Sequence, residues 1–203
     1  MRKGKLLVVS GPSGAGKSTI SQRAAKECEI FLSVSATTRP PRQGEDERHY
    51  IFLTQEEFQK KIDENAFLEY ANVYGQYYGT LRKPVLEMME QGKNVLLEID
   101  VQGSMQVKKA YDECEMVFVL PPSLNELKRR LKARKSETEE QYNLRVAKAL
   151  EEIAIAPQYD YLVINEEIDS AVMQLKEVIS SLDRKMKYHV DFIHAYMEEE
   201  KDI

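Results

Sequence analysis

The 203-residue sequence predicts an α/β protein whose mostly parallel sheet is covered by helices on both faces. Its short apolar runs do not alternate with polar residues, which is typical of strands buried on both sides. Stretches with helical spacing separate consecutive runs, as expected for crossover connections in a parallel sheet. A glycine-rich loop at 11–16 follows the first run and precedes the first helical stretch.

The elements follow one another in a regular order. The first run, 5–10 (KLLVVS), predicts a strand, and helical spacing covers 17–27 after the glycine-rich loop. The tail 187–203 is expected to form a final helix with a frayed acidic end. Further strands are expected at 30–34, 94–100, 115–120 and 161–165, and further helices at 83–91, 103–111, 123–134, 139–156 and 168–186.

Two segments interrupt this rhythm. The stretch 37–80 is rich in proline, glycine and aromatic residues, which predicts a small inserted subdomain of short strands. The stretch 129–145 reads as a charged helix-loop-helix. Because the length requires only one domain, we expect a single domain over 1–203. Its core would comprise 1–36, 81–128 and 146–186, with a C-terminal extension at 187–203.

Composition restricts the partners and the compartment. The net charge of −5 argues against general binding to nucleic acid or to a membrane surface, so any basic site must be local. Cys28 and Cys114 follow no metal-ligand or redox spacing and are expected to be buried, reduced thiols. The first apolar run is too short for a signal peptide or a membrane span, which favours the cytoplasm.

The loop GPSGAGKS matches the P-loop pattern G-x-x-x-x-G-K-[ST]. Its glycines let backbone N–H groups surround a phosphate, and the following helix adds its positive end. Lys17 is expected to reach the β- and γ-phosphates of a nucleotide, and the Ser18 hydroxyl to ligate Mg²⁺. A dinucleotide-binding loop is excluded because no third glycine is correctly placed. The expected nucleotide-binding residues here are Gly11, Pro12, Ser13, Gly14, Ala15, Gly16, Lys17, Ser18 and Thr19.

Acidic residues end the strand predicted at 94–100. Its last residues are Glu98, Ile99 and Asp100, and open α/β sheets place ligands beyond this end of their strands. We therefore expect Asp100 near the metal beside the P-loop. The alternative is an aspartate that only ends a strand in a turn.

A proline-rich basic loop, SATTRPPRQGE at 35–45, predicts a second anion site. Polyproline geometry puts Arg39 and Arg42 on one edge, about 9 Å apart at Cα, where both could reach one phosphate or carboxylate. A solvated charged turn is the alternative. The later stretch 67–80 (FLEYANVYGQYYGT) supplies tyrosines, whose hydroxyls can donate to phosphate and whose rings can pack on a base.

Taken together, these motifs resemble the guanylate kinase family, nucleoside monophosphate kinases that transfer a phosphoryl group from ATP to GMP or dGMP. The resemblance implies a three-layer P-loop kinase fold with a GMP-binding subdomain at about 37–80 and a helical lid at about 129–145. It runs from Leu6 to about Asp183 and rests on GPSGAGKST, SVSATTRPPRQGE, FLEYANVYGQYYGT, LEIDVQG, YDYLVIN and the set Arg130, Arg134 and Arg145.

The resemblance also implies roles for particular residues. Lys17 and the lid arginines Arg130, Arg134 and Arg145 would be catalytic, and Asn165 would lie near the adenine. Guanine would face Ser35, Glu69, Thr80 and Asp100, and the GMP phosphate would be held by Arg39, Arg42, Tyr50 and Tyr78. The chemistry is consistent, because a carboxylate can accept from both the N1–H and the N2–H₂ of guanine, which adenine cannot offer. The connection at 46–49 is shorter than in many family members and lacks their glycine.

The implied cofactor is Mg²⁺ and the implied substrates are ATP and GMP or dGMP, without nucleic acid or membrane. The oligomeric state stays open, with a homo-oligomer as one option. Two other functions remain as alternatives: a non-catalytic phosphopeptide-binding module, and a P-loop kinase for another phosphorylated small molecule. The intact Lys17 and Ser18 argue against the first, and the pair Glu69 and Thr80 has no evident use in the second.

Overall fold

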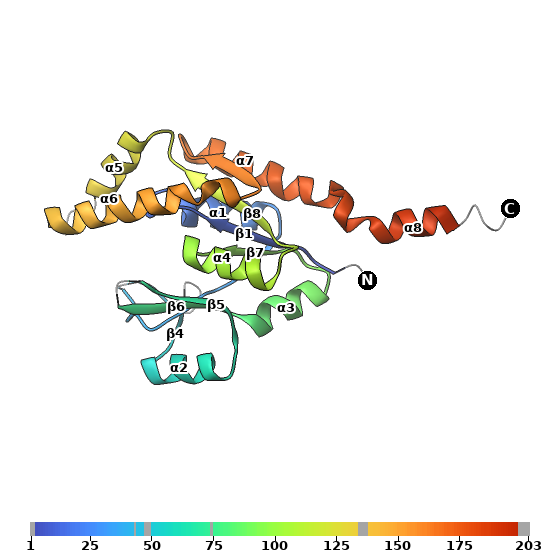
Figure 1. The fold of residues 1–203 in the computed structure, drawn as a ribbon, viewed down its shortest axis with the longest axis horizontal. Helices are drawn as coiled ribbons and strands as arrows, with labels where there is room; N and C mark the ends of the chain where they lie inside the picture. Colours follow the sequence, from blue (N-terminus) through green and yellow to red (C-terminus); the bar gives the residue numbers. More distant parts are fainter. Residues whose placement is uncertain (1–2, 43, 47–49, 74, 134–137, 199–203) are drawn as a thin grey trace.

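The computed structural model describes residues 3–42, 44–46, 50–73, 75–133 and 138–198. In this part of the chain, a central sheet of five parallel strands lies beside a smaller mixed sheet (Figure 1). The central strand order is β2-β7-β1-β8-β9. These strands span Leu6–Ser10 (β1), Phe31–Leu32 (β2), Val95–Glu98 (β7), Glu115–Leu120 (β8) and Tyr161–Ile164 (β9).

Helices cover both faces of the central sheet, because successive residues of each strand point to opposite sides. On β1, Leu7 and Val9 pack in one cluster with residues of α1 (Lys17–Glu27) and α7 (Ile168–Ser181). Leu6 and Val8 pack in the other cluster with residues of α3 (Arg82–Glu90) and α4 (Val101–Ala110). The predicted three-layer α/β fold is thereby confirmed.

The smaller sheet has the order β4-β3-β6-β5. Its strands span Ala36–Thr37 (β3), Ile51–Phe52 (β4), Phe67–Val73 (β5) and Gln76–Leu81 (β6), and the β5–β6 pair is antiparallel. This part also contains helix α2 (Gln55–Asp63), which the sequence analysis did not predict. The sequence feature that predicts this helix is a capping box. In it, Glu57 N donates to Thr54 Oγ1 over 3.1 Å and Thr54 N donates to Glu57 Oε2 over 2.8 Å.

Two further helices, α5 (Leu124–Lys132) and α6 (Glu139–Ala154), pack on each other through Leu127, Leu131 and Ala149. A 3₁₀ turn, Ala156–Gln158, follows α6.

The chain beyond α7 differs from the prediction. The helix expected at 168–186 ends at Ser181 and is followed by the 3₁₀ turns Leu182–Arg184 and Met186–Tyr188, then by α8 (Val190–Glu198). The prediction of buried thiols holds for Cys114 but is wrong for Cys28, which is only half-buried at the end of α1. In the described ranges, no helix has the length and apolar character needed to cross a bilayer.

The smaller sheet has its own apolar core around Phe58, which is 0% exposed. The Phe58 ring stacks on Phe67 and on Tyr77, with centroids 4.4 and 5.3 Å away. Phe58→Ala should therefore lower the free energy of unfolding by about 3–5 kcal/mol, measured by urea denaturation. Leu162→Ala, at a position 56% exposed on β9, is the control and should change it by less than about 0.5 kcal/mol. Equal effects of the two substitutions would contradict this packing.

Candidate active site

The loop between β1 and α1 requires its glycines. Gly11, Gly14 and Gly16 have φ values of 142°, 86° and 89°, which residues with a side chain rarely adopt. A Cβ at Gly11 would lie 2.3 Å from the Val119 carbonyl oxygen, and one at Gly16 would lie 2.2 Å from Asn165 Nδ2. The loop therefore sits directly on the ends of the neighbouring strands. Lys17 Nζ donates to the carbonyls of Gly11 and Pro12 over 2.6 and 3.2 Å.

Asn165, just after β9, holds this loop by a side-chain hydrogen bond. Asn165 is 1% exposed, and its Nδ2 donates to the Ala15 carbonyl over 2.7 Å. The backbone carbonyl of Asn165 accepts a hydrogen bond from Arg130 Nη2 over 2.9 Å. The resemblance implies a position near the adenine, and in the structure the Asn165 side-chain amide is buried against the loop. Asn165 thereby links the P-loop to the arginine of α5.

The acid that contacts Ser18 is Glu98. Ser18 Oγ donates to Glu98 Oε1 over 2.6 Å, whereas Asp100 Oδ1 accepts from Gly103 N over 2.8 Å and caps α4. Of the two acids at this strand end, Glu98 is therefore the one that contacts Ser18, and Asp100 lines the same cavity as Glu98 and Lys17. Asp100 lies beyond the end of β7 and is the N-cap residue of α4, so its side chain binds the first turn of that helix, whereas Glu98 is the last residue of the strand. A hydroxyl beside a carboxylate is a donor set that suits Mg²⁺.

Two adjoining cavities meet at the P-loop. The first has a volume of about 290 Å³ and receives side chains from four parts of the fold. These are Gly11, Ser13 and Lys17; then Ser35, Tyr50, Glu69, Val73 and Tyr78; then Glu98, Ile99 and Asp100; and Arg145, Lys148 and Glu152 of α6. The second, about 400 Å³, is lined by Ser13, Gly14, Gly16, Lys17, Ser18, Thr19, Glu98 and Arg130. Because Ser13, Lys17 and Glu98 line both, the cavities share a boundary at these residues.

Glu69 of β5 is a buried carboxyl group at the wall of the first cavity. It is 5% exposed, and Thr80 Oγ1 donates to its Oε1 over 2.7 Å. A Cβ at Gly103 would lie 2.3 Å from Glu69 Oε2, so α4 approaches this carboxyl group through its glycine. Burial raises the pKa of Glu69 to about 7, while the hydrogen bond from Thr80 acts in the opposite direction. Thr80 is 1% exposed and holds Glu69 in position.

The basic loop is organised around Glu45, a residue the sequence analysis did not assign. Arg39 Nη2 lies 2.9 Å from Glu45 Oε2, and the backbone N–H of Arg42 donates to the same oxygen over 2.8 Å. The hydrogen bond from the Arg42 N–H lowers the pKa of Glu45 most, burial opposes it, and the Arg39 guanidinium lowers the pKa further, so the overall direction is down. Glu45 thus binds the guanidinium of Arg39 and the backbone of Arg42. The signal was the acid three residues after Arg42, a spacing typical of turns.

The guanidinium of Arg39 also meets the tyrosines of the smaller sheet. Its Cζ lies 5.4 Å from the centroid of the Tyr50 ring, and the Tyr50 and Tyr78 rings are 6.0 Å apart in an edge-on arrangement. Arg42 is exposed and lines a third cavity, about 470 Å³, together with Ser35 and Tyr50. Tyr50 and Tyr78 therefore line the first cavity and Arg42 lines the third, while Arg39 packs on Tyr50.

Helix α6 brings Arg145, Lys148 and Glu152 to the cavity wall. Their spacing of three and four residues places them on one helix face, and this spacing was the missed signal for Lys148 and Glu152. Burial raises the pKa of Glu152, and the charges of Lys148 and Lys17 oppose this effect. Arg134, also expected in the lid, lies outside the described residues.

A family model described as guanylate kinase matches residues 3–182. The chain belongs to the guanylate kinase family. The guanylate kinase of Clostridium acetobutylicum is 50% identical over 179 residues, which cover 88% of this chain and 86% of that relative. The guanylate kinase of Clostridioides difficile is 45% identical over 202 residues, 98% of each chain. A crystal structure of guanylate kinase from Anaplasma phagocytophilum matches with a TM-score of 0.76 at 30% identity, covering 91% of this chain and 89% of that one.

The predicted resemblance is thereby confirmed, and the chain is a nucleotide-binding enzyme of the kinase class. Its P-loop, basic loop and helical pair α5–α6 lie within the matched range. The cavities described above are therefore the candidate active site of a guanylate kinase family member.

The raised pKa of Glu69 makes folding stability depend on pH. The folded protein keeps this proton up to about pH 7, whereas the ordinary pKa is 4.5. The protonated Glu69 side chain therefore contributes fully to the free energy of unfolding below about pH 4.5, and this contribution is lost as the pH rises toward 7. Relative to wild type, Glu69→Gln should gain roughly 2–3 kcal/mol of unfolding free energy between pH 5 and pH 8.

Urea denaturation without nucleotides, repeated across this pH range, measures the effect. The exposed Glu56 offers a matched control, and Glu56→Gln should follow the wild-type pH dependence. A difference between wild type and Glu69→Gln that stays constant with pH would contradict the raised pKa.

Proposed function

We propose that the chain transfers the γ-phosphoryl group of ATP to GMP or dGMP, giving ADP and GDP or dGDP. The observation that carries this proposal is one cavity in which Glu69 and the tyrosines of the smaller sheet share walls with Lys17 of the P-loop. A donor on the P-loop and an acceptor on the smaller sheet would then meet at Lys17.

On the donor side, the P-loop residues 11–19 would surround the β- and γ-phosphates of ATP through backbone N–H groups and the start of α1. Lys17 and Arg130 line the cavity on this side and would contribute positive charge. Ser18 and Glu98 would hold Mg²⁺, which supplies charge neutralisation at the phosphate oxygens when it is bound. Asn165 would act indirectly, by holding the Ala15 carbonyl and Arg130 in place.

On the acceptor side, guanine recognition would depend on Glu69. A carboxylate accepts from both N1–H and N2–H₂ of guanine, and Asp100 in the same cavity wall adds a further acceptor. Ser35 can donate its hydroxyl to O6. Thr80, whose hydroxyl is bonded to Glu69, would fix the carboxylate. Other bases would leave these buried groups unpaired, which disfavours their binding.

The GMP phosphate would be held by Tyr50 and Tyr78 together with the basic loop. Tyr50 lines both the first and the third cavity, and Arg42 lines the third. Arg39 packs over Tyr50 and is fixed by Glu45, so it would hold the tyrosine side of the phosphate site. The charge of both arginines persists at all physiological pH values.

The transfer needs positive charge around the phosphoryl oxygens more than it needs a base, because the attacking GMP phosphate is already an anion. Arg145 of α6 and Arg130 of α5 line adjoining cavities that share Lys17, so charge would reach the transferring group from both sides. Arg134 is proposed as a third lid arginine. Lys148 joins this set, because it lines the cavity one turn after Arg145.

The phosphoryl acceptor is tested with purified enzyme, ATP and Mg²⁺, by following ADP release with GMP, dGMP, AMP, UMP or CMP. We expect activity with GMP and dGMP only. Glu69→Gln should weaken GMP recognition by roughly 1–3 kcal/mol, about 5- to 150-fold in kcat/KM. Turnover with AMP, or with a phosphorylated sugar in place of GMP, would support a P-loop kinase of other specificity. Binding of a phosphopeptide without any turnover would support the non-catalytic alternative.

A substitution at Lys17 should affect phosphoryl transfer but not GMP binding. Lys17→Ala should lower kcat by at least about 100-fold, because a cation at the transferring phosphate is lost. Its GMP affinity, measured by calorimetry, should stay within about threefold, because the guanine contacts lie on the smaller sheet. The exposed Lys83→Ala is the control and should keep both values. Near-normal turnover of Lys17→Ala would remove the P-loop from the mechanism.

A further inference from the structure

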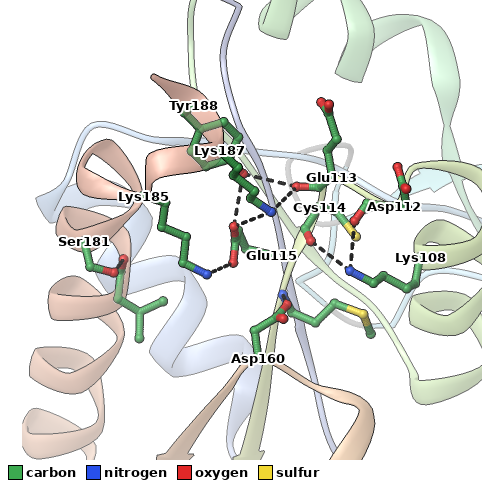
Figure 2. A network of polar contacts seen from close by, with 12 residues as sticks. Lys108, Asp112, Glu113, Cys114, Glu115, Asp160, Ser181, Lys185, Lys187 and Tyr188 are labelled. Atoms are coloured by element: carbon green, nitrogen blue, oxygen red, sulfur yellow. Dashed lines mark hydrogen bonds and ion pairs between the residues drawn. The ribbon is translucent and has the colours of Figure 1, made fainter. Parts of the chain in front are cut away.

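The C-terminal extension is fastened to the core by a buried carboxylate at the start of β8 (Figure 2). The Glu115 side chain is 0% exposed and is paired with the ammonium groups of Lys185 and Lys187, the latter at 2.7 Å. Tyr188 donates its hydroxyl to Glu115 Oε1 over 3.2 Å. Burial alone would raise the pKa of Glu115, but the hydrogen bonds from the two lysines lower it overall. The segment 185–188 is therefore held firmly by an ionised buried group.

A second attachment lies beside the first. Lys5, which is 4% exposed near the start of β1, pairs with Asp183. The Lys5 ammonium also lies 4.9 Å from the centroid of the Tyr188 ring. Two core positions thus hold the stretch just before α8, and Figure 1 shows that α8 then points away from the rest of the molecule.

Helix α8 exposes a broad apolar face. None of its nine described residues is buried. At about 100° per residue, its large apolar side chains occupy one arc of about 160°, and Asp191, His194 and Glu198 occupy the opposite side. The exposed fractions on the apolar arc are 45% for Val190, 65% for Phe192, 40% for Ile193, 65% for Tyr196 and 57% for Met197.

Such a helix needs a partner. Isolated helices shorter than about 12–15 residues are marginal in water, and most helix stability comes from packing an amphipathic face. A membrane surface does not fit, because 190–198 contains no Lys or Arg and carries Asp191 and Glu198. The chain's own core does not supply the contact either, since its attachment at 183–188 directs α8 outward.

We propose that α8 pairs with α8 of a second copy of this chain, antiparallel about a two-fold axis near Phe192 and Ile193. A two-fold axis brings the same apolar arc of each copy together, as in most homodimers. The charges along the extension are complementary in this arrangement. Lys185 and Lys187 share one carboxylate, that of Glu115, and Arg184 precedes them. The segment before α8 is therefore positive. The end of the helix is negative, because its last residue is Glu198.

The helix dipoles favour the same antiparallel pairing, because the positive end of each helix lies beside the negative end of the other. The contact would lie outside the cavities, since no residue of α8 lines any of the three. Dimerisation and phosphoryl transfer are therefore separable by mutation.

The oligomeric state tests this proposal. Sedimentation velocity of the full chain over a concentration series should show a dimer that dissociates on dilution. Phe192→Asp combined with Tyr196→Asp should weaken the dimer by at least about 100-fold, while kinase turnover per chain stays unchanged. Met173→Asp, at a position 59% exposed on α7, is the matched control and should keep the dimer.

A symmetric cross-link tests the geometry. Ile193→Cys should form an intermolecular disulfide under mild oxidation, because equivalent residues face each other near the two-fold axis. Met173→Cys should not. The proposal is overturned by a wild-type chain that is monomeric at all concentrations, by a dimer that survives the double aspartate variant, or by a monomer that co-sediments with anionic vesicles.

Discussion

The buried carboxyl group of Glu69 connects the two sheets of the molecule. It lies on β5, accepts from Thr80 of β6, and is approached by α4 at Gly103. Helix α4 is in turn capped by Asp100, which follows the central strand β7. The Glu69 side chain is therefore fixed by Thr80 of its own sheet and by helix α4, which follows a strand of the central sheet. Its burial raises the pKa of Glu69 to about 7, so the group that we propose for guanine recognition is also costly for folding when it is ionised.

The central sheet provides the second constraint. Its parallel strands end at one edge, which brings the glycine loop after β1, Glu98 of β7 and Asn165 after β9 together. The left-handed backbone at Gly11 and Gly16 lets the loop rest directly on the neighbouring strand ends. Asn165 fastens the loop from below and holds Arg130 through its own carbonyl. The P-loop, Glu98 and Arg130 of α5 are therefore positioned at one edge of the central sheet, whereas Glu69 and Tyr78 come from the smaller sheet.

Much of this could be predicted from sequence, because the controlling signals are local. Apolar runs and helical spacing predicted the central strands and covering helices, and GPSGAGKS predicted the loop. Long-range side-chain pairing could not be predicted, because spacing does not show that Glu98 meets Ser18 or that the Asn165 side chain binds the Ala15 carbonyl. The role of Glu45 in the basic loop is local, with contacts three and six residues away, and was overlooked. Helix α2 is different, because its capping box at Thr54 and Glu57 was readable and was overlooked.

We propose that the donor and acceptor nucleotides occupy adjoining cavities that meet at Lys17. Calorimetry tests this arrangement with a bisubstrate ligand in which adenosine and guanosine are joined through five phosphates. We predict that this ligand binds wild type more tightly than either ATP or GMP. We also predict that Lys17→Ala and Glu69→Gln each weaken its binding. A ligand that binds no more tightly than ATP alone, or that is insensitive to Glu69→Gln, would contradict the account.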